Sequence, residues 1–217
     1  WTRAVYFTSL SDIKNVLGID KYLHQEGLAH RFMPVLASDY HKDAGGVYVE
    51  GSYELLMADD IRWGNLNLPE VSVDPESRRN LLFVKQAYMR LAEALVNRNQ
   101  NDSAIAVLDR CQEFFPDEKI PYDLYMMAYP EIYYRAGAPE KADELINKII
   151  DNSLDNLRYF SELDNQFIPY YTESIRENLA IINEMSNVAA EYNRMELSKS
   201  LENTLEQEFD KFLGIFN

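Results

Sequence analysis

The chain has 217 residues and a mass of 25.3 kDa, with 47% hydrophobic and 26% charged residues. This length and composition are typical of a soluble globular protein with one or two domains. The 36 acidic and 21 basic side chains give a formal net charge of −15. Such acidity argues against nucleic acid and anionic membrane as primary ligands, because both bind clusters of Lys and Arg.

Neither a membrane span nor a signal peptide is visible in the sequence. No apolar run approaches the ~18 residues of a membrane span, and the first residues, WTRAVYFTSL, lack the basic and apolar regions of a signal peptide. Because the chain starts at Trp1, on the edge of a strand-like stretch, we expect it to be part of something longer. The single cysteine, Cys111, excludes an intrachain disulfide framework and leaves the compartment open.

Residues 1–70 are predicted to form a small mixed α/β segment. Residues 4–9 and 28–36 contain enough β-branched and aromatic side chains for two short strands, and Pro34 would put the end of the second at an edge or a bend. The other local predictions are a brief helix over residues 11–17, a polar loop over residues 39–46, a short helix over residues 51–61, and a turn at residues 62–65 anchored by Trp63.

Residues 71–217 are predicted to form a helical repeat domain, and its first helix has a strong start signal. Asp74-Pro75-Glu76 supplies a capping acid, a proline at the first helical position and an acid near the positive end of the helix dipole. This helix is expected to run to about Asn97. After a turn at residues 99–101, a partner helix should follow and pack antiparallel to it, because the connection is so short.

The start of the partner helix allows two interpretations. Asp102 or Ser103 can cap it. The same stretch matches an N-glycosylation sequon, Asn101-Asp102-Ser103, and Asp102-Ser103-Ala104 resembles a bacterial O-glycosylation acceptor. Capping explains both residues without modification, so we favour it. The helix should end near residues 115–116.

The apolar side chains of these two helices follow one register. With Lys85 as position 1, they occupy positions 4, 7, 8, 11, 20, 24, 27 and 32, which are Tyr88, Leu91, Ala92, Leu95, Ala104, Leu108, Cys111 and Pro116. This register resembles the tetratricopeptide repeat, a helix–turn–helix unit of about 34 residues. The first repeat is therefore placed near residues 85–118, with Cys111 as a small buried side chain rather than a reactive thiol.

A second repeat is predicted near residues 123–156. Gly137 would end its first helix and Pro139 would open the next, while Pro130 would kink the first helix unless it lies in the first turn. The expected core positions are Met126, Tyr129, Tyr133, Ala142, Ile146 and Ile149.

A degenerate third repeat is predicted near residues 182–215. Its core positions would be held by Met185, Val188, Ala189, Tyr192, Leu201 and Leu205. Glu208 at the next core position suits a terminal unit with one polar face. Residues 154–171, between the second and third repeats, are expected to form a short helix and a turn at Pro169.

The order of several segments resembles one family closely. The segments are VYFTSLSD, GLAHRFMPV, RWGNLN, RRNLLFVKQAYMRLAEAL, AIAVLDRC, PDEKIPYD and YYRAG. Together they resemble the soluble C-terminal, tetratricopeptide-like region of multi-span Bacteroidetes membrane proteins similar to glycosyltransferase family 117, the protein O-mannosyltransferase-like group. The resemblance covers residues 4 to about 165. It implies that lipid-sugar chemistry belongs to a membrane portion outside this chain, that no catalytic residue lies here, and that the repeats face the periplasm.

The residues that most often carry chemistry form no catalytic, metal or cofactor motif. The spacing of His24, His30 and His41 matches no helical ligand pair, and neither HExxH nor CxxC accompanies them. Paired acids at residues 59–60 and at residues 39 and 43 are expected by chance among so many acids. Gly45-Gly46 lacks the surroundings of a phosphate-binding loop, and GxSxG is absent. We therefore predict no metal, no cofactor and no catalytic residue.

Aromatic side chains offer the best candidate binding surface. The sequence has 15 Tyr, 10 Phe and 2 Trp, and these rings either fill the spaces between helices or line a groove for an extended peptide or glycan. Residues 122, 125, 129 and 133 would share one helical stripe, whereas Tyr134 would be rotated away from it and exposed. The candidate groove residues are Tyr125, Tyr129, Tyr133, Tyr134, Tyr170 and Tyr171.

The preferred interpretation is a mainly α protein that acts as a non-catalytic interaction or scaffolding module. It would form the periplasmic C-terminal part of a membrane glycosyltransferase-like protein and would bind protein or peptide, including a glycoprotein substrate, without inserting into the membrane. One alternative is a free-standing adaptor. Another is that the α/β segment completes a transferase active site around His24, His30, Asp39 and Trp63. The partner and the oligomeric state stay open.

Overall fold

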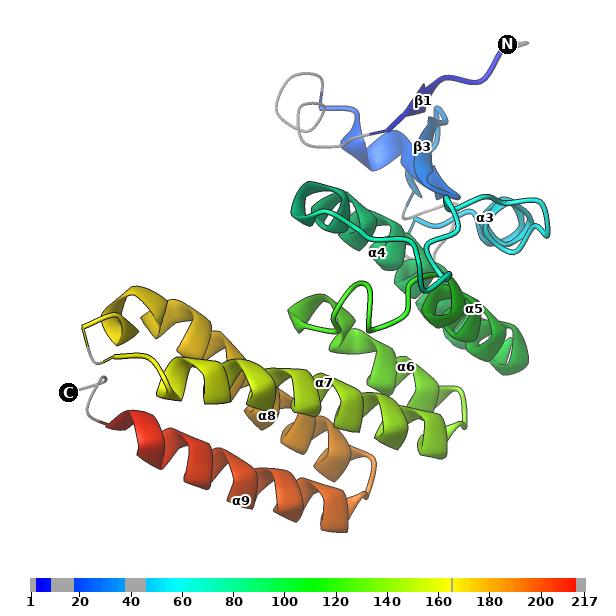
Figure 1. Cartoon of the computed structure of the whole chain (residues 1–217). Coiled ribbons are helices and arrows are strands. Elements are labelled where there is room, and N and C mark those ends of the chain that lie inside the picture. Colours follow the sequence, from blue (N-terminus) through cyan, green and yellow to red (C-terminus); the bar gives the residue numbers. More distant parts are fainter. Residues whose placement is uncertain (1–2, 9–17, 38–45, 165, 214–217) are drawn as a thin grey trace. The chain divides into compact units, whose positions relative to one another are not determined.

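The chain is mainly helical and carries a small three-stranded sheet, in agreement with the prediction of a mainly α protein with a small α/β segment (Figure 1). The computed structural model describes residues 3–8, 18–37, 46–164 and 166–213. Two compact units divide the chain, Trp1–Ile120 and Pro121–Asn217. The predicted domain boundary near residue 70 therefore lies inside the first unit.

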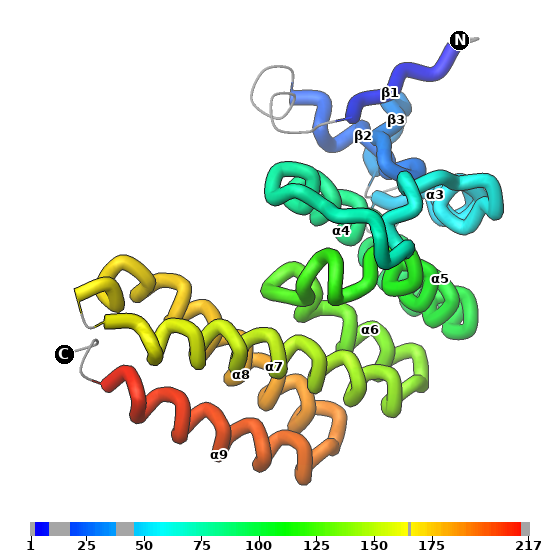
Figure 2. Tube along the Cα trace, viewed as in Figure 1, coloured from blue at the N-terminus to red at the C-terminus, as the bar shows by residue number. Residues whose placement is uncertain are grey.

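The sheet of the first unit has the strand order β1-β3-β2, and all its pairs are antiparallel (Figure 2). The strands are β1 (Tyr6–Phe7), β2 (Leu23–Glu26) and β3 (Ala29–Phe32). The predicted strand over residues 28–36 is correct only for β3, and β2 was not predicted. Gly27, with φ +63°, reverses the chain between them, and this left-handed conformation favours glycine.

The short helix α3 (Val49–Leu56) is tied to this hairpin. The fully buried Ser52 hydroxyl donates to the backbone oxygen of Gln25 at 3.2 Å and accepts from the backbone N–H of Gly27 at 3.0 Å. The prediction of a helix over residues 51–61 is therefore wrong at both ends, because α3 starts two residues earlier and stops before Met57. The predicted helix over residues 11–17 and most of the predicted loop over residues 39–46 lie outside the described residues.

Two longer helices follow, α4 (Pro75–Asn97) and α5 (Asn101–Phe114), and they pack against each other. The predicted start of α4 is confirmed, because Asp74 accepts the backbone N–H groups of Glu76 and Ser77 at 3.0 and 3.1 Å. The predicted cap of α5 is wrong. The helix already begins at Asn101, so Asp102 lies within its first turn and the cap position falls on Gln100, whose side chain makes no capping bond.

Aromatic rings join the segment before α4 to the helix pair. Trp63 lies 5.1 Å from the ring of Phe115 and 6.4 Å from that of Tyr88, as predicted for its anchoring role. The Tyr88 hydroxyl donates to the backbone oxygen of Leu56 at 2.9 Å. These contacts explain why α4 and α5 belong to the same unit as the α/β segment. The predicted core positions are buried as well, namely Tyr88, Leu91, Ala92, Leu95, Ala104, Leu108 and Cys111.

The second unit opens with a 3-10 turn over Leu124–Met126, then α6 (Ala128–Arg135) and α7 (Pro139–Ser161). Gly137 has φ +83° and ends α6 with two backbone bonds, from its own N–H to Tyr134 and from Ala138 to Tyr133, which is a Schellman-type end. Pro130 lies in the first turn of α6, so its missing N–H breaks no helical bond. The predicted core positions of this stretch are buried, namely Met126, Tyr129, Tyr133, Ala142, Ile146 and Ile149.

The second half of this unit differs from the prediction in its helix lengths. α7 continues to Ser161, so residues 154–161 belong to it and form no separate helix, and a 3-10 helix over Ile168–Tyr171 carries Pro169. α8 (Thr172–Glu191) begins ten residues before the predicted repeat start at 182, and α9 (Met195–Phe212) follows. α8 packs against both α7 and α9.

The core of this helix group is partly as predicted. Met185, Val188, Ala189 and Leu201 are buried, whereas Tyr192 and Leu205 are only half-buried. Glu208 forms an ion pair with Lys211 at 2.6 Å, in keeping with a polar face on the last helix. Within the described residues, none of the helices has both the length and the apolar character needed to cross a membrane.

Candidate binding pockets

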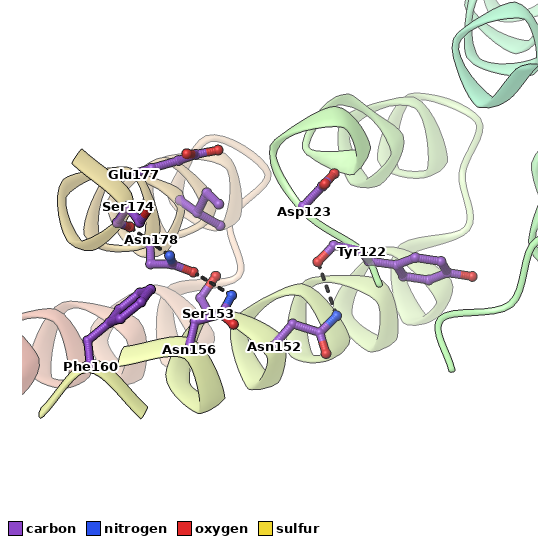
Figure 3. Close-up of a pocket in the computed structure, with 10 residues that line it drawn as sticks. Tyr122, Asp123, Asn152, Ser153, Asn156, Phe160, Ser174, Glu177 and Asn178 are labelled. Atoms are coloured by element: carbon purple, nitrogen blue, oxygen red, sulfur yellow. Dashed lines mark hydrogen bonds between the residues drawn. The ribbon is translucent and has the colours of Figure 1, made fainter. Parts of the chain in front are cut away.

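The second unit contains a polar cavity of about 260 Å³ between α7 and α8, which we call the amide pocket (Figure 3). Asn152, Asn156 and Phe160 lie one helical turn apart on α7 and therefore share one face. Ser174 and Asn178 have the same spacing on α8. The two faces meet because α7 and α8 pack against each other.

Side-chain amides hold the wall of the amide pocket together. Asn156 Nδ2 donates to Asn178 Oδ1 at 3.2 Å, and Asn178 Nδ2 donates to the backbone oxygen of Ser174 at 2.7 Å. Asn152 Nδ2 donates to the backbone oxygen of Tyr122 at 3.1 Å (Figure 3). Asn178 is buried with both ends of its amide in use. The side-chain oxygen of Asn156, by contrast, accepts no hydrogen bond within the described part of the chain.

The pocket also has an acidic character. Asp123 and Glu177 line it, and no Lys or Arg is found among the described residues around it. Asp123 Oδ1 accepts the backbone N–H of Tyr125 at 3.0 Å, which fixes the carboxylate at the start of the 3-10 turn. Carboxylates and amide oxygens together favour ligands that present N–H donors or a positive charge.

The six predicted groove tyrosines are not gathered on one surface. Tyr129 and Tyr133 are fully buried and cannot line an open groove. Tyr125 and Tyr170 are 55% and 82% exposed. The stripe fails because the helix begins only at Ala128, so that Tyr125 lies in the preceding 3-10 turn. Tyr171 contacts the amide pocket only indirectly, through the stacking of its ring on that of the pocket residue Phe160 at 5.1 Å.

The expectation that Tyr134 is exposed is wrong. Its side chain is buried, its hydroxyl donates to Asp143 Oδ1 at 2.6 Å, and its ring stacks on that of Tyr192 at 4.7 Å. Arg194 also pairs with Asp143. Burial, followed by the hydrogen bond to Asp143, raises the pKa of Tyr134, so the phenol stays a donor at neutral pH.

The first unit contains a cavity of about 700 Å³ between the sheet and α4, which we call the sheet pocket. Gln25 and His30 face each other across β2 and β3, and Phe83, Ala87 and Arg90 come from α4. Gln25 Nε2 donates to the backbone oxygen of Ala87 at 3.1 Å. Both ring nitrogens of His30 are buried and have no hydrogen-bond partner among the described residues.

Burial lowers the pKa of His30, and the charge of Arg90 lowers it further. Burial also lowers the pKa of the Arg90 guanidinium, against an opposing effect of Glu93. Ordinary arginine stays protonated far above neutral pH. The pocket therefore holds a cation in a poorly solvated position, next to a neutral imidazole.

The histidines and Trp63 do not converge on one site. His24 and His30 point to opposite faces of the sheet, because His24 pairs with Arg31 whereas His30 pairs with Gln25. His24 Nε2 lies 3.1 Å from the backbone oxygen of Val35, and Trp63 lies in the aromatic cluster near α4 and α5. Asp39 and His41 lie outside the described residues.

No group of three His, Cys, Asp or Glu side chains that could hold a metal ion occurs in the part of the chain that the structure describes. Cys111 forms no disulfide bond within the described residues, and its side chain is buried, as predicted.

Sequence reasoning missed both pockets. The amide pocket has a visible signal, since Asn152, Asn156 and Phe160 follow a four-residue step inside an apolar periodic helix. The sheet pocket has none, because the pairing of Gln25 with His30 depends on a hairpin that was not predicted. Comparison of the chain with protein-family models, curated proteins and solved structures finds no match in any of the three.

Proposed function

We propose that this chain is a non-catalytic, tetratricopeptide-like interaction module that binds an extended polypeptide segment in the amide pocket. Three consecutive helix pairs support the repeat assignment, namely α4–α5, α6–α7 and α8–α9. Stacks of such pairs bind their partners by surface complementarity along the stack and need no cofactor.

The observation that carries the proposal is the Asn156–Asn178 bridge between α7 and α8. It holds Asn156 at the pocket with its side-chain oxygen directed to no other described group. An extended peptide alternates N–H and C=O groups along its edge, and a side-chain amide can pair with both. The side-chain oxygen of Asn156 can therefore accept a backbone N–H of a peptide without requiring one sequence.

Size and charge narrow the ligand further. At about 260 Å³, the cavity is smaller than the ~300–1,000 Å³ of typical small-molecule sites, so it suits a ligand of which only a part enters. The carboxylates of Asp123 and Glu177 favour a segment with a basic side chain. A lysine-bearing stretch of an unfolded or extended protein meets both requirements.

Binding to an array of extended Gly-Ser peptides with lysine, glutamate or phenylalanine at the centre tests this function. We expect the 217-residue chain to be retained most by the lysine series. Asn156→Ala should weaken retention on every series without unfolding the protein, because Asn156 contacts the peptide backbone and is exposed. Asn187→Ala removes an equally exposed asparagine of α8 that does not line the pocket and serves as the control. Equal retention of wild type and Asn156→Ala on every series would refute the proposal.

The resemblance of residues 4–165 to the C-terminal region of glycosyltransferase family 117-like membrane proteins supports a wider context for this module. In that context it recruits protein substrate, including glycoprotein, to a membrane enzyme on the periplasmic side. An immunoblot of fractionated source cells with an antibody against this chain tests the context. A membrane band far heavier than 25.3 kDa would support it. A free band near that mass would leave a free-standing adaptor instead.

A further inference from the structure

The sheet pocket has the size of a small-molecule site. Its volume of about 700 Å³ falls within the ~300–1,000 Å³ typical of such sites. It lies entirely within the first unit, so nothing in the proposed function of the amide pocket accounts for it.

The cavity exists because the sheet and α4 do not close on each other with apolar side chains. The face of the sheet that carries Gln25 and His30 looks toward α4. On the helix side, the small residue Ala87 lies between the larger Phe83 and Arg90, at steps of four and three residues. The Gln25–Ala87 hydrogen bond joins the sheet to α4 at one point of the cavity wall, and the space beside this bond stays unfilled.

The polar groups of this cavity suit an anion. Arg90 and His30 line it together with the neutral polar residues Thr8, Asn80 and Gln86, and no Asp or Glu is found among the described lining residues. The guanidinium of Arg90 matches the two oxygens of a carboxylate, whereas the buried ring nitrogens of His30 lie out of reach of a ligand. Glu93, one turn further along α4, raises the pKa of Arg90, against the larger effect of burial.

The rim of the cavity is apolar. Phe83, on α4, is 69% exposed, and Leu28, in the turn between β2 and β3, is 44% exposed. A ligand side chain placed against them would gain burial at about 25 cal/mol per Å² of apolar area. The guanidinium of Arg90 and the apolar side chains of Phe83 and Leu28 line the same cavity, so one compact ligand can contact both.

We propose that the sheet pocket binds a carboxylate that is carried next to an apolar side chain. The Arg90 guanidinium donates hydrogen bonds to the carboxylate, and the apolar side chain packs against Phe83 and Leu28. The C-terminal residue of a polypeptide has this chemistry, and so does a small free aromatic or aliphatic acid.

Isothermal titration of the 217-residue chain with N-acetyl-phenylalanine and with N-acetyl-phenylalaninamide tests the proposal. The two probes share the ring and differ in the negative charge. We expect the acid to bind roughly tenfold or more tightly than the amide, the difference typical of a lost charged hydrogen bond. Equal affinities, or no heat from the acid at millimolar concentration, would overturn the proposal.

Variants separate the two halves of the site. Phe83→Ala should weaken the acid about tenfold and leave folding intact, because the side chain is largely exposed. Arg90→Gln should remove the preference for the acid over the amide, with circular dichroism as the check on folding. Tyr170→Ala, which removes an exposed aromatic of the second unit, should change neither. Loss of acid binding in Tyr170→Ala but not in Phe83→Ala would place binding elsewhere and overturn the assignment.

A Gly-Ser peptide that ends in phenylalanine with a free carboxylate, and the same peptide with a C-terminal amide, identify the source of the ligand. Tighter binding of the free peptide than of N-acetyl-phenylalanine assigns the pocket to polypeptide C-termini. Tighter binding of N-acetyl-phenylalanine assigns it to small acids. Asn156→Ala should leave all these affinities unchanged. A negative result for binding in the sheet pocket would therefore leave the proposed function of the amide pocket untouched, and the reverse also holds.

Discussion

At the scale of single residues, the side chains that hold the second unit together include polar ones. Asp143 accepts hydrogen bonds from the Tyr134 hydroxyl and from Arg194, and thereby joins α6, α7 and the start of α9. The stacked ring of Tyr192 covers Tyr134. Removal of a hydroxyl that donates to a partly buried carboxylate is costly, because Asp143 Oδ1 loses one of its two donors.

Tyr134→Phe is therefore expected to lower the free energy of unfolding by about 1–2 kcal/mol while keeping the ring in place. Urea unfolding followed by circular dichroism measures this. Tyr125→Phe is the control, because Tyr125 is 55% exposed, and it should leave stability unchanged. Peptide binding should survive Tyr134→Phe. Unchanged stability combined with lost binding would restore the interpretation of Tyr134 as a surface contact.

His30 makes stability depend on pH. Burial, together with the charge of Arg90, lowers its pKa in the folded protein below the ordinary 6.5. The unfolded chain therefore binds the proton more readily, and stability is lost as the pH falls below about 6.5. Above that pH both states are neutral at this position and the effect vanishes.

His30→Gln should accordingly flatten the fall in melting temperature between neutral and mildly acidic pH. The groups that face this imidazole are Arg90 from α4 and Gln25 from β2, and neither titrates in this range. Thermal melts of wild type and His30→Gln across that pH range provide the measurement. Parallel curves for the two proteins would show that His30 is not the titrating group.

At the scale of elements, the start of α4 shows how one side chain fixes a helix end. Asp74 accepts the N–H groups of Glu76 and Ser77 and the hydroxyl of Ser77. The Ser77 hydroxyl and then the Ser77 backbone N–H lower the pKa of Asp74 below its ordinary 3.8. The stabilisation from the ionised cap is thus present above that pH and is lost as the pH falls through the lowered pKa.

Asp74→Ala should lower the melting temperature at neutral pH, and the difference from wild type should shrink in acid. Asp74→Asn retains a capping oxygen without the charge, so it should lie between the two at neutral pH and show no titration of its own. Differential scanning calorimetry at neutral and acidic pH tests this. An Asp74→Ala deficit that stays the same down to the lowest pH would contradict the assignment.

The sequence predicts elements well where a local signal marks both ends, and poorly where tertiary packing decides. The Asp74-Pro75 start and the Gly137 end were correct because caps and left-handed glycines act within a few residues. The extension of α7 to Ser161 was missed, since the repeat register predicts an earlier end and only packing against α8 favours the longer helix. The hairpin at Gly27 was missed because LHQE lacks the β-branched residues that mark strands.

The candidate sites follow the same rule. The buried repeat positions were predictable from a periodic pattern, whereas the amide pocket needs two helices to meet in the right rotation. Asn152 and Asn156 were visible as a pair on one helix, but their partner Asn178 lies 22 residues beyond Asn156 in sequence. Tyr125 left the predicted stripe because the helix begins only at Ala128, and Tyr134 is buried because Tyr192 and Asp143, which both lie outside α6, contact it.

At the scale of the whole molecule, the chain divides into units where one hydrophobic core ends and the next begins. It does not divide near residue 70, where the α/β segment gives way to helices only. The α/β segment covers the helix pair of the first unit through Trp63 on Phe115 and through the Tyr88 hydroxyl on Leu56. Beyond α5, Lys119 Nζ donates to the backbone oxygens of Pro69 and Val71 at 2.6 and 2.7 Å. These contacts cross the predicted boundary at residue 70 and make residues 1–120 one folding unit.

Fragments test this division. We expect residues 1–120 to be helical and to unfold cooperatively, and residues 71–120 to be largely unfolded when they are alone. The shorter fragment loses the covering of Tyr88 and Phe115, and removal of one large aromatic from such a core costs about 3–5 kcal/mol, which is a large part of the stability of a small domain. Residues 121–217, with their own core around Tyr129, Ile146 and Ile182, should fold by themselves and serve as the control. If residues 71–120 melt as cooperatively as residues 1–120, the helix pair is stable without the α/β segment, and the boundary belongs near residue 70 after all.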